Sequence, residues 1–311
     1  MSNFGGRWSM SRFERLTRTG QLDRAWVESE LIPLAESLRG KIDNGQPLRG
    51  RSLYLLFYEP SLLTRTSFER AMGLLGGTPY FTEDASQFFP VTTPDYIENI
   101  IANLAAMHMD MVVLRSSDQG VMERAEEEAE AQSMPLINGG SLEDHPTQAL
   151  TDLYTLKREI GAVDGARIAE VHTIFHRNVS ALLLGLAMYE GVTVMQVPFS
   201  GQADPDVVSE CEAQGVAFEM GTMDSLVEAD AIYLNGPRTV AHAQLLKSRG
   251  AFNLRIDEEF MMKLKPGCVI LDPMQRSGDF DILVSDPRLA NYRQAENSLF
   301  VRMALLRTML G

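Results

Sequence analysis

Residues 59–69 read Glu-Pro-Ser-Leu-Leu-Thr-Arg-Thr-Ser-Phe-Glu, and this stretch decides the fold prediction. It follows an apolar run at 53–57, Leu-Tyr-Leu-Leu-Phe, which is typical of a buried strand. Beyond it a helical pattern of apolar residues begins, so we predict a strand, a polar loop and a helix. In an α/β protein, such a loop at the carboxyl end of a strand is where an anion or a substrate binds. The hydroxyl and arginine side chains of the loop suit an anion, whereas Leu62 and Leu63 do not.

The same alternation of strand-like and helical patterns continues along the whole chain. It stops at Gly161–Gly165, which we predict as the domain boundary, and then starts again. This order predicts an α/β fold of two doubly wound domains, each a parallel sheet with helices on both faces. We place the first domain at 1–160 and the second at 161–290, with a final helix from residue 291. Residues 12–39 are predicted as one helix.

The bulk composition limits the possible partners. Of the 311 residues, 45% are hydrophobic and 23% are charged, as in ordinary soluble domains. A formal charge of −14 at pH 7 argues against nucleic acids and anionic membranes, because both bind basic surfaces. The longest apolar run, 181–189, is too short to span a membrane, and Cys211 and Cys268 lack the spacing of a zinc site or a disulfide framework. We therefore expect a cytoplasmic protein.

Four polar clusters fall at strand ends or helix starts, where one crevice can collect them. They are Ser61 with Thr64 and Arg65, then Arg115, then His145 with Gln148, and finally His176 with Arg177. Each cluster alone has an ordinary explanation, because hydroxyls and a histidine before proline often cap helices and an arginine after a strand is often a surface charge. Their shared position makes them candidates for a ligand site, in which Ser61 and Arg65 would bind substrate.

Four segments, in chain order, carry a resemblance to a known family. They are the stretch 59–69, Asn138-Gly139-Gly140, the segment 145–153 (His-Pro-Thr-Gln-Ala-Leu-Thr-Asp-Leu) and the segment 302–306 (Arg-Met-Ala-Leu-Leu). Together they resemble the aspartate/ornithine carbamoyltransferase family, and the aspartate branch more closely. The resemblance implies a carbamoyltransferase-like fold in which the last helix, 291–311, packs back on the first domain. It also implies a homotrimer with its sites at the subunit interfaces, and no metal or organic cofactor.

The resemblance also assigns roles to individual residues. In that family, hydrogen-bond donors polarise a carbonyl group while an amine attacks it and phosphate leaves. At matching positions, Thr64, Arg115 and His145 would contact the carbamoyl oxygen. Gln148 would contact the carbamoyl amide nitrogen, and Arg177 would bind the α-carboxylate of the amino acid. The expected ligand is therefore a small amino-acid-like molecule, or one carrying a carbamoyl or ureido group.

The phosphate-binding part of the family pattern is missing. The family loop reads Ser-Thr-Arg-Thr-Arg, whereas residues 61–65 read Ser-Leu-Leu-Thr-Arg. The family's second contact is a lysine from the neighbouring subunit, but the matching region 84–90 has no lysine, nor does any position between Lys41 and Lys157. Charge-assisted hydrogen bonds contribute about 1.5–3 kcal/mol each. Losing two of them predicts that phosphate binds roughly 10²–10⁴-fold more weakly.

The region that binds the second substrate departs from the pattern as well. An Arg-x-Gln loop in the aspartate branch is replaced here by Asn-Gly-Pro-Arg at 235–238, so Arg238 would have to bind the side-chain carboxylate from a different position. The family's His-Pro-Leu-Pro-Arg becomes Asp-Pro-Met-Gln-Arg at 272–276, which keeps Arg276 but places an acid beside the amine site.

Three functions remain open on the sequence alone. The first is an enzyme of this superfamily that keeps the carbonyl pocket but uses a non-standard donor or reaction. The second is an ordinary carbamoyl-phosphate-dependent carbamoyltransferase in which Arg65 or Arg238 restores the phosphate contact. The third is a catalytically silent paralogue that binds an amino acid or has a structural role.

Overall fold

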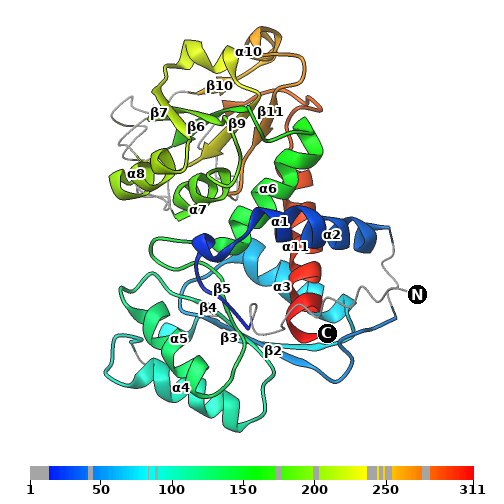
Figure 1. Cartoon of the computed structure of the whole chain (residues 1–311), viewed down its shortest axis with the longest axis vertical. Coiled ribbons are helices and arrows are strands. Elements are labelled where there is room, and N and C mark those ends of the chain that lie inside the picture. Colours follow the sequence, from blue (N-terminus) through cyan, green and yellow to red (C-terminus); the bar gives the residue numbers. More distant parts are fainter. Residues whose placement is uncertain are drawn as a thin grey trace, which may run out of the picture.

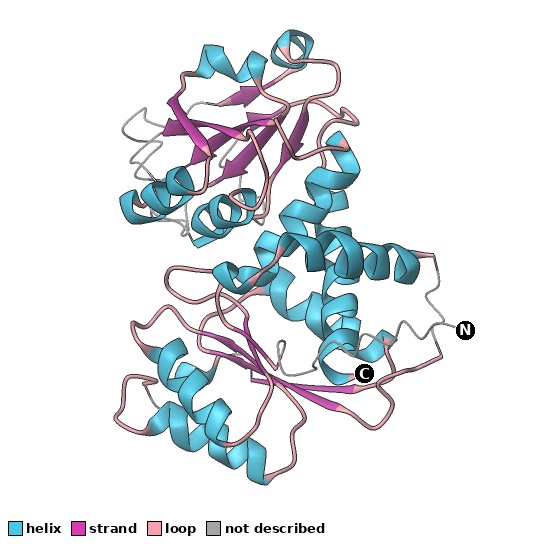
Figure 2. Cartoon of the chain, viewed as in Figure 1, coloured by secondary structure: helices cyan, strands magenta, loops and turns pink. Residues whose placement is uncertain are grey.

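Two parallel sheets, one in each half of the chain, form the framework of the computed structural model (Figure 1). The structure describes residues 14–40, 45–82, 84–87, 90–172, 177–198, 203–236, 244, 248, 254–274 and 281–311. Helices cover both faces of each sheet, as the colouring by secondary structure shows (Figure 2). The predicted fold class of two parallel-sheet α/β domains is confirmed.

The first sheet has five parallel strands in the order β1-β5-β4-β2-β3. The strands are β1 Arg15–Leu16, β2 Ser52–Phe57, β3 Thr78–Thr82, β4 Val112–Arg115 and β5 Leu136–Asn138. On one face, β2 packs against α2 (Ile32–Arg39) and α3 (Leu62–Leu74). On the other face, β4 packs against α4 (Tyr96–Ala106) and α5 (Val121–Ala131). The strand β2 is thus followed by a loop and a helix, as the stretch 59–69 predicts.

The second sheet has the parallel order β11-β9-β6-β7-β8. Its strands are β6 Arg167–His172, β7 Thr193–Pro198, β8 Ala217–Met220, β9 Ala231–Asn235 and β11 Val269–Leu271. The helices α7 (Arg177–Leu186) and α8 (Pro205–Ala213) cover one face. The 3₁₀-helix η5 (Met223–Glu228) and α10 (Glu258–Lys263) lie against the other. A separate parallel pair, β10 (Arg255–Ile256) with β12 (Asp281–Ile282), completes the strands described.

Two long helices, α6 (Pro146–Ile160) and α11 (Asn291–Leu310), run between the two halves (Figure 1). The helix α6 starts with a proline at its first position, where no backbone donor is needed. It ends at Gly161, whose φ of +81° favours glycine. The helix α11 packs against α2, α3 and α6. The last helix therefore packs back on the first domain, as predicted, while the domain limits at residues 160 and 290 stay a prediction.

The prediction of one helix over 12–39 is wrong for the residues described. Residues Arg15–Leu16 form the edge strand β1, which pairs with β5, and a 3₁₀ turn, η2, follows at Thr19–Gln21. The helical part starts only after Asp23, whose side chain accepts a hydrogen bond from the backbone N–H of Trp26 at 3.0 Å. An aspartate at this position caps a helix and fixes its start. The helix then continues through α1 (Arg24–Trp26), a π-helical stretch (Val27–Leu31) and α2.

The packing of α11 yields a first prediction. Val301 lies in the middle of this helix, fully buried in the core of the first domain. Replacing it by alanine removes two methyl groups and leaves a small cavity, so we expect the free energy of unfolding to fall by about 2 kcal/mol. Urea denaturation measures this loss. The matched control is Arg307→Ala on the exposed side of the same helix, which we expect to change the free energy by less than about 0.5 kcal/mol; an equal loss in both variants would contradict the buried packing of α11.

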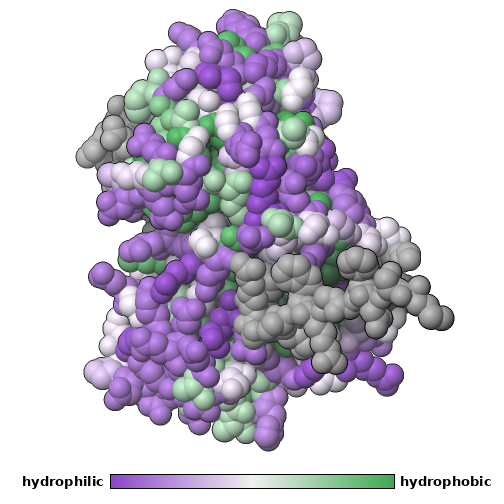
Figure 3. Space-filling model, viewed as in Figure 1, coloured by the Kyte–Doolittle hydropathy of each residue, from purple (hydrophilic) through white to green (hydrophobic). Residues whose placement is uncertain are grey.

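The visible surface is mostly hydrophilic, with apolar side chains in small separate groups (Figure 3). This agrees with the formal charge of −14. Among the residues that the structure describes, no helix is both long and apolar enough to cross a membrane.

Candidate functional site

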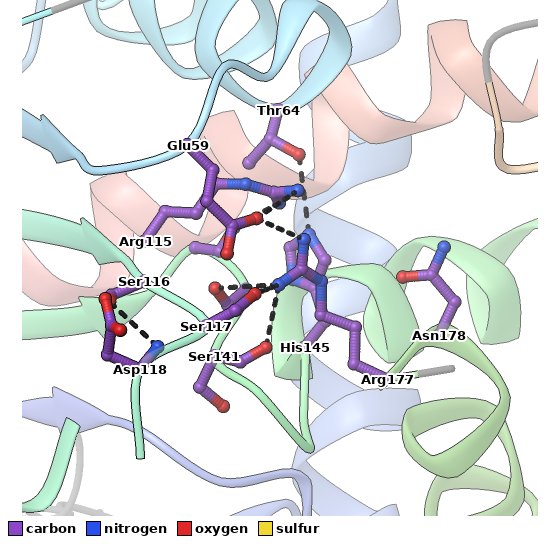
Figure 4. A network of polar contacts seen from close by, with 12 residues as sticks. Glu59, Thr64, Arg115, Ser116, Ser117, Asp118, Ser141, His145, Arg177 and Asn178 are labelled. Atoms are coloured by element: carbon purple, nitrogen blue, oxygen red, sulfur yellow. Dashed lines mark hydrogen bonds and ion pairs between the residues drawn. The ribbon is translucent and has the colours of Figure 1, made fainter. Parts of the chain in front are cut away.

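Glu59, directly after β2, is the centre of a polar network at the carboxyl ends of the first sheet's strands (Figure 4). Its Oε2 lies 3.0 Å from Nη2 of Arg177 and 3.7 Å from Nη2 of Arg115. Burial alone would raise the pKa of Glu59, but Arg177, Ser117 and Arg115 together lower it below its ordinary value. Glu59 is therefore a carboxylate at neutral pH, and it offsets part of the positive charge of the two arginines.

Arg115 ends β4 and is held against the loop that follows β5. Its Nη1 donates a hydrogen bond to the carbonyl oxygen of Gly139 at 3.0 Å. The next residue, Gly140, has a φ of +120°, and a Cβ atom there would lie 2.5 Å from Nη1 of Arg115 and 3.3 Å from Nε of Arg177. Only glycine lets the backbone pass this close to both guanidinium groups. The Gly-Gly pair thus serves to bring the two arginines together.

Arg177 is the first residue of α7 in the second domain, and only 5% of its surface is exposed. Its Nη1 donates to Oγ of Ser117 at 3.0 Å and to the carbonyl oxygen of Ser141 at 2.8 Å, both in the first domain. With the Glu59 contact, one guanidinium is bound by three segments of the other domain. The arginine predicted to bind a carboxylate is therefore fixed at the junction of the domains, facing the loops that follow β2, β4 and β5 (Figure 4).

His145 and Thr64 meet from two different helices. His145 precedes α6 and is 97% buried, and its Nε2 lies 3.4 Å from Oγ1 of Thr64 in the first turn of α3. Its Nδ1 lies 3.4 Å from Oγ1 of Thr147. Figure 4 shows the side chains of Thr64, Arg115 and His145 pointing toward one another. A hydroxyl, a guanidinium and an imidazole in this arrangement can donate hydrogen bonds to one carbonyl oxygen.

A cavity of about 240 Å³ lies next to this cluster, between the starts of α3, α6 and α11 and the loop after β11. Its lining includes Leu63, Gln148, Asp272, Met274 and Arg302. The first turn of α3 contributes apolar surface here through Leu63, which is 39% exposed. Its neighbour Leu62, 54% exposed, does not line the cavity. The part of the wall that α3 contributes is thus hydrocarbon, whereas polar and charged side chains from α6, α11 and the loop after β11 line much of the rest.

Arg65 does not replace the missing anion contact in this structure. Its Nε lies 3.4 Å from Oε1 of Glu69, one turn along α3, and its guanidinium stacks on the ring of Phe81 at 4.9 Å from the ring centre. Ser61 precedes α3 without capping it through its side chain. Both residues were predicted to bind substrate, and for both this role stays a prediction.

The structure brings together most of the residues that the sequence singles out. Thr64, Arg115, His145 and Arg177 lie in one cluster, and Gln148 lies in the wall of the adjoining cavity. Arg238 and Arg276, together with His176, lie outside the described residues, so their predicted contacts are not described. The roles of all these residues stay predictions, while their proximity is a finding.

Sequence reasoning gave no role to Glu59, Ser117 or Ser141, although all three contact Arg177. The position of Glu59 directly after the buried strand was a usable signal, because side chains at that place point to the edge of the sheet where ligands bind. Within the part of the chain that the structure describes, no three His, Cys, Asp or Glu side chains are arranged to hold a metal ion.

Comparisons with known proteins agree with this geometry. Residues 15–158 match the family model described as "Aspartate/ornithine carbamoyltransferase, carbamoyl-P binding domain". Aspartate carbamoyltransferase 1 of pea chloroplasts (Pisum sativum) is 32% identical over 302 residues, covering 93% of this chain and 77% of the pea protein. The aspartate carbamoyltransferase catalytic subunit of Methanocaldococcus jannaschii is 30% identical over 293 residues, covering 90% of this chain and 93% of that subunit.

Solved structures extend the likeness to three dimensions. The crystal structure of aspartate transcarbamoylase from Trypanosoma cruzi with carbamoyl phosphate has a TM-score of 0.84, with 29% identity. The match covers 96% of this chain and 97% of the other. The fold and these relatives place the protein among two-domain α/β transferases. The chain belongs to the aspartate/ornithine carbamoyltransferase family, and the prediction that it is an enzyme of the transferase class is confirmed.

Proposed function

We propose that this protein is an aspartate carbamoyltransferase-type enzyme that acts on an amino-acid-like substrate and does not use carbamoyl phosphate as its donor in the usual way. One observation supports the proposal that carbamoyl phosphate is not the usual donor. At the start of α3, where the family holds phosphate, this chain presents the exposed side chains of Leu62 and Leu63. The nearest arginine in that helix, Arg65, is bound to Glu69 and Phe81 instead.

The carbonyl side of the site supports transfer chemistry. The side chains of Thr64, Arg115 and His145 can stabilise negative charge on a carbonyl oxygen, which is the main electrostatic requirement of acyl and carbamoyl transfer. An amine nitrogen would then form a bond to the carbonyl carbon, the bond from that carbon to the leaving group would break, and one amine proton would be released. Because the cluster is already assembled, the site would mainly orient its two reactants.

Arg177 supports an amino-acid-like substrate. Its guanidinium is preoriented by Ser117 and Ser141, so little conformational freedom is lost when an anion binds, and the anion would share the guanidinium with Glu59. We propose that it binds the carboxylate of the amine substrate. We also propose that the protein is a homotrimer with its sites at the subunit interfaces and that it is cytoplasmic, as expected from the sequence.

A second candidate function is the ordinary carbamoyl-phosphate-dependent reaction with aspartate. The relatives favour it, since those from pea and M. jannaschii are named aspartate carbamoyltransferases. The T. cruzi enzyme has also been crystallised with carbamoyl phosphate and aspartate. For this candidate, Arg65 would have to leave Glu69 and Phe81, or Arg238 would have to reach the phosphate. No observation on the described residues favours the third function, a catalytically silent paralogue, because Thr64, Arg115 and His145 are assembled as a carbonyl-binding group.

Calorimetric titration with carbamoyl phosphate separates the two candidates. We expect the dissociation constant to be roughly 10²–10⁴-fold weaker than that of the M. jannaschii catalytic subunit in the same buffer, because two charge-assisted hydrogen bonds are absent. We also expect no carbamoylation of L-aspartate. Comparable affinity together with turnover on aspartate would overturn the proposal and establish the second candidate.

A further inference from the structure

The cavity of about 240 Å³ runs along one face of α11. Successive turns of this helix contribute to its lining, at Asn291, Tyr292, Gln294, Ala295, Ser298 and Arg302. Tyr292 is 80% exposed, whereas Arg302, about 15 Å further along the helix axis, is 1% exposed. The cavity therefore opens to solvent beside Tyr292, and Arg302 lies at its closed end.

Arg302 is a buried cation that uses few of its hydrogen-bond donors. A guanidinium carries five N–H groups. Among the residues that the structure describes, Arg302 makes one hydrogen bond, from Nη1 to Oγ of Ser67 at 2.5 Å, and its Nε has no partner. Its guanidinium carbon also lies 5.0 Å from the centre of the Phe68 ring. Because buried N–H groups without acceptors are costly, we expect the cavity to hold something that accepts hydrogen bonds.

The charge of Arg302 is only partly compensated. No described carboxylate forms an ion pair with it, and burial lowers its pKa to about 9 although the charge of Asp152 in α6 opposes this effect. Asp152 is itself committed to neutral donors. It accepts hydrogen bonds from the amides of Gln148 and Gln294, both at 2.7 Å, and from the hydroxyl of Tyr233 at 2.8 Å. Arg302 is thus protonated at pH 7, and the cavity is where a counter-ion fits.

We propose that this cavity is a carboxylate subsite, in which the guanidinium of Arg302 binds a singly charged anion that enters beside Tyr292. A carboxylate matches the paired N–H groups of a guanidinium in shape and charge. A phosphate dianion fits less well, because it places two negative charges against one guanidinium. Asp152 lies nearby and Asp272 also lines the cavity, so the second charge would be repelled.

The subsite rests on the proposed function for its use alone. Leu63 and Gln148 line the cavity, and Thr64, the residue after Leu63, belongs to the carbonyl-side cluster with His145. A ligand whose carbonyl group is held by that cluster can therefore extend a carboxylate toward Arg302. In the proposed reaction, the donor that replaces carbamoyl phosphate would carry this carboxylate.

Titration with acetate tests the subsite directly. In protein labelled with ¹⁵N in its arginines, the Nε–Hε resonance of Arg302 is assigned by its absence in Arg302→Met, or in Arg302→Lys if the methionine variant does not fold. We expect this resonance to move saturably at pH 7 as acetate is added, with half-saturation on the order of 10 mM for so small a ligand. Inorganic phosphate at equal ionic strength is expected to move it much less.

Two variants provide the controls. Ala295→Phe fills the cavity from its partly exposed wall and changes no contact of Arg302, so the resonance should stay fixed when acetate is added. Arg293→Met removes an arginine from the same helix that pairs with Glu159 and does not line the cavity, so the response should be kept.

Three results would overturn the proposal. A wild-type resonance that does not respond to acetate would mean that the cavity holds water only. An equal response in Ala295→Phe would mean that acetate acts from elsewhere, and a response to phosphate alone would exclude the carboxylate class. None of these results depends on turnover. If carbamoyl phosphate proves to be the ordinary donor, the proposed function fails, but the resonance of Arg302 still decides whether the cavity binds a carboxylate.

Discussion

Replacing Leu62 by threonine and Leu63 by arginine together is expected to raise the affinity for carbamoyl phosphate by roughly 10²–10⁴-fold. Both leucines are in the first turn of α3 and are 54% and 39% exposed, so a smaller threonine and a longer arginine at these positions fit without disturbing the core. A hydroxyl and a guanidinium would supply two charge-assisted hydrogen bonds at a helix N-terminus, which itself favours an anion. Calorimetric titration of wild type and double variant at one ionic strength measures the gain.

The control for added charge is Met107→Arg. Met107 is 61% exposed at the end of α4, away from α3, so an arginine there raises the net charge by the same amount without a contact at the site. We expect its dissociation constant to stay within about twofold of the wild type. A folded double variant that binds no more tightly than Met107→Arg would show that the leucines do not occupy a phosphate position.

The fold of this protein followed from local sequence patterns because parallel α/β domains repeat one simple unit. The run 53–57 and the helix after residue 61 were both recognisable, since a buried central strand is continuously apolar and a helix after it is amphipathic. The two-residue strand β1 was not, because its pairing with β5 is decided by a partner 121 residues away. The helix was also placed too early, although its capping residue, Asp23, is a local signal for its start.

The sequence was sufficient to predict which residues form the candidate site, but not which side chains contact one another there. The positions of Thr64, Arg115, His145 and Arg177 at strand ends and helix starts indicated that they converge. What no spacing revealed is that Glu59 binds two of the arginines, or that Asp152 fixes Gln148 from behind. These contacts depend on side-chain directions across the two domains. They decide which donors and acceptors the site presents, and therefore its chemistry.

The ion pair between Arg177 and Glu59 leads to the other large prediction. The side chain of Arg177 is 4% exposed and that of Glu59 is 26% exposed, so Arg177→Met leaves a mostly buried carboxylate with much of its compensation gone. We expect the free energy of unfolding at pH 7 to fall by about 3 kcal/mol. This is at the lower end of the losses seen when one partner of a buried ion pair is removed, because Glu59 remains partly exposed to solvent and keeps its contact with Arg115. Urea denaturation at several pH values measures the loss.

The pH dependence identifies the cause of that loss. In the wild type, the pKa of Glu59 lies below its ordinary value, so the pair stabilises the fold above the unfolded pKa and this contribution is lost as the pH falls through the folded pKa. In Arg177→Met, burial is opposed by fewer charges and the pKa of Glu59 should rise, so the variant recovers stability relative to the wild type between pH 7 and about pH 4. Adding Glu59→Gln to Arg177→Met removes the buried charge and should restore part of the loss at pH 7. A loss that is independent of pH and unchanged in the double variant would mean that Arg177 stabilises the domain junction through its contacts with Ser117 and Ser141, and not through Glu59.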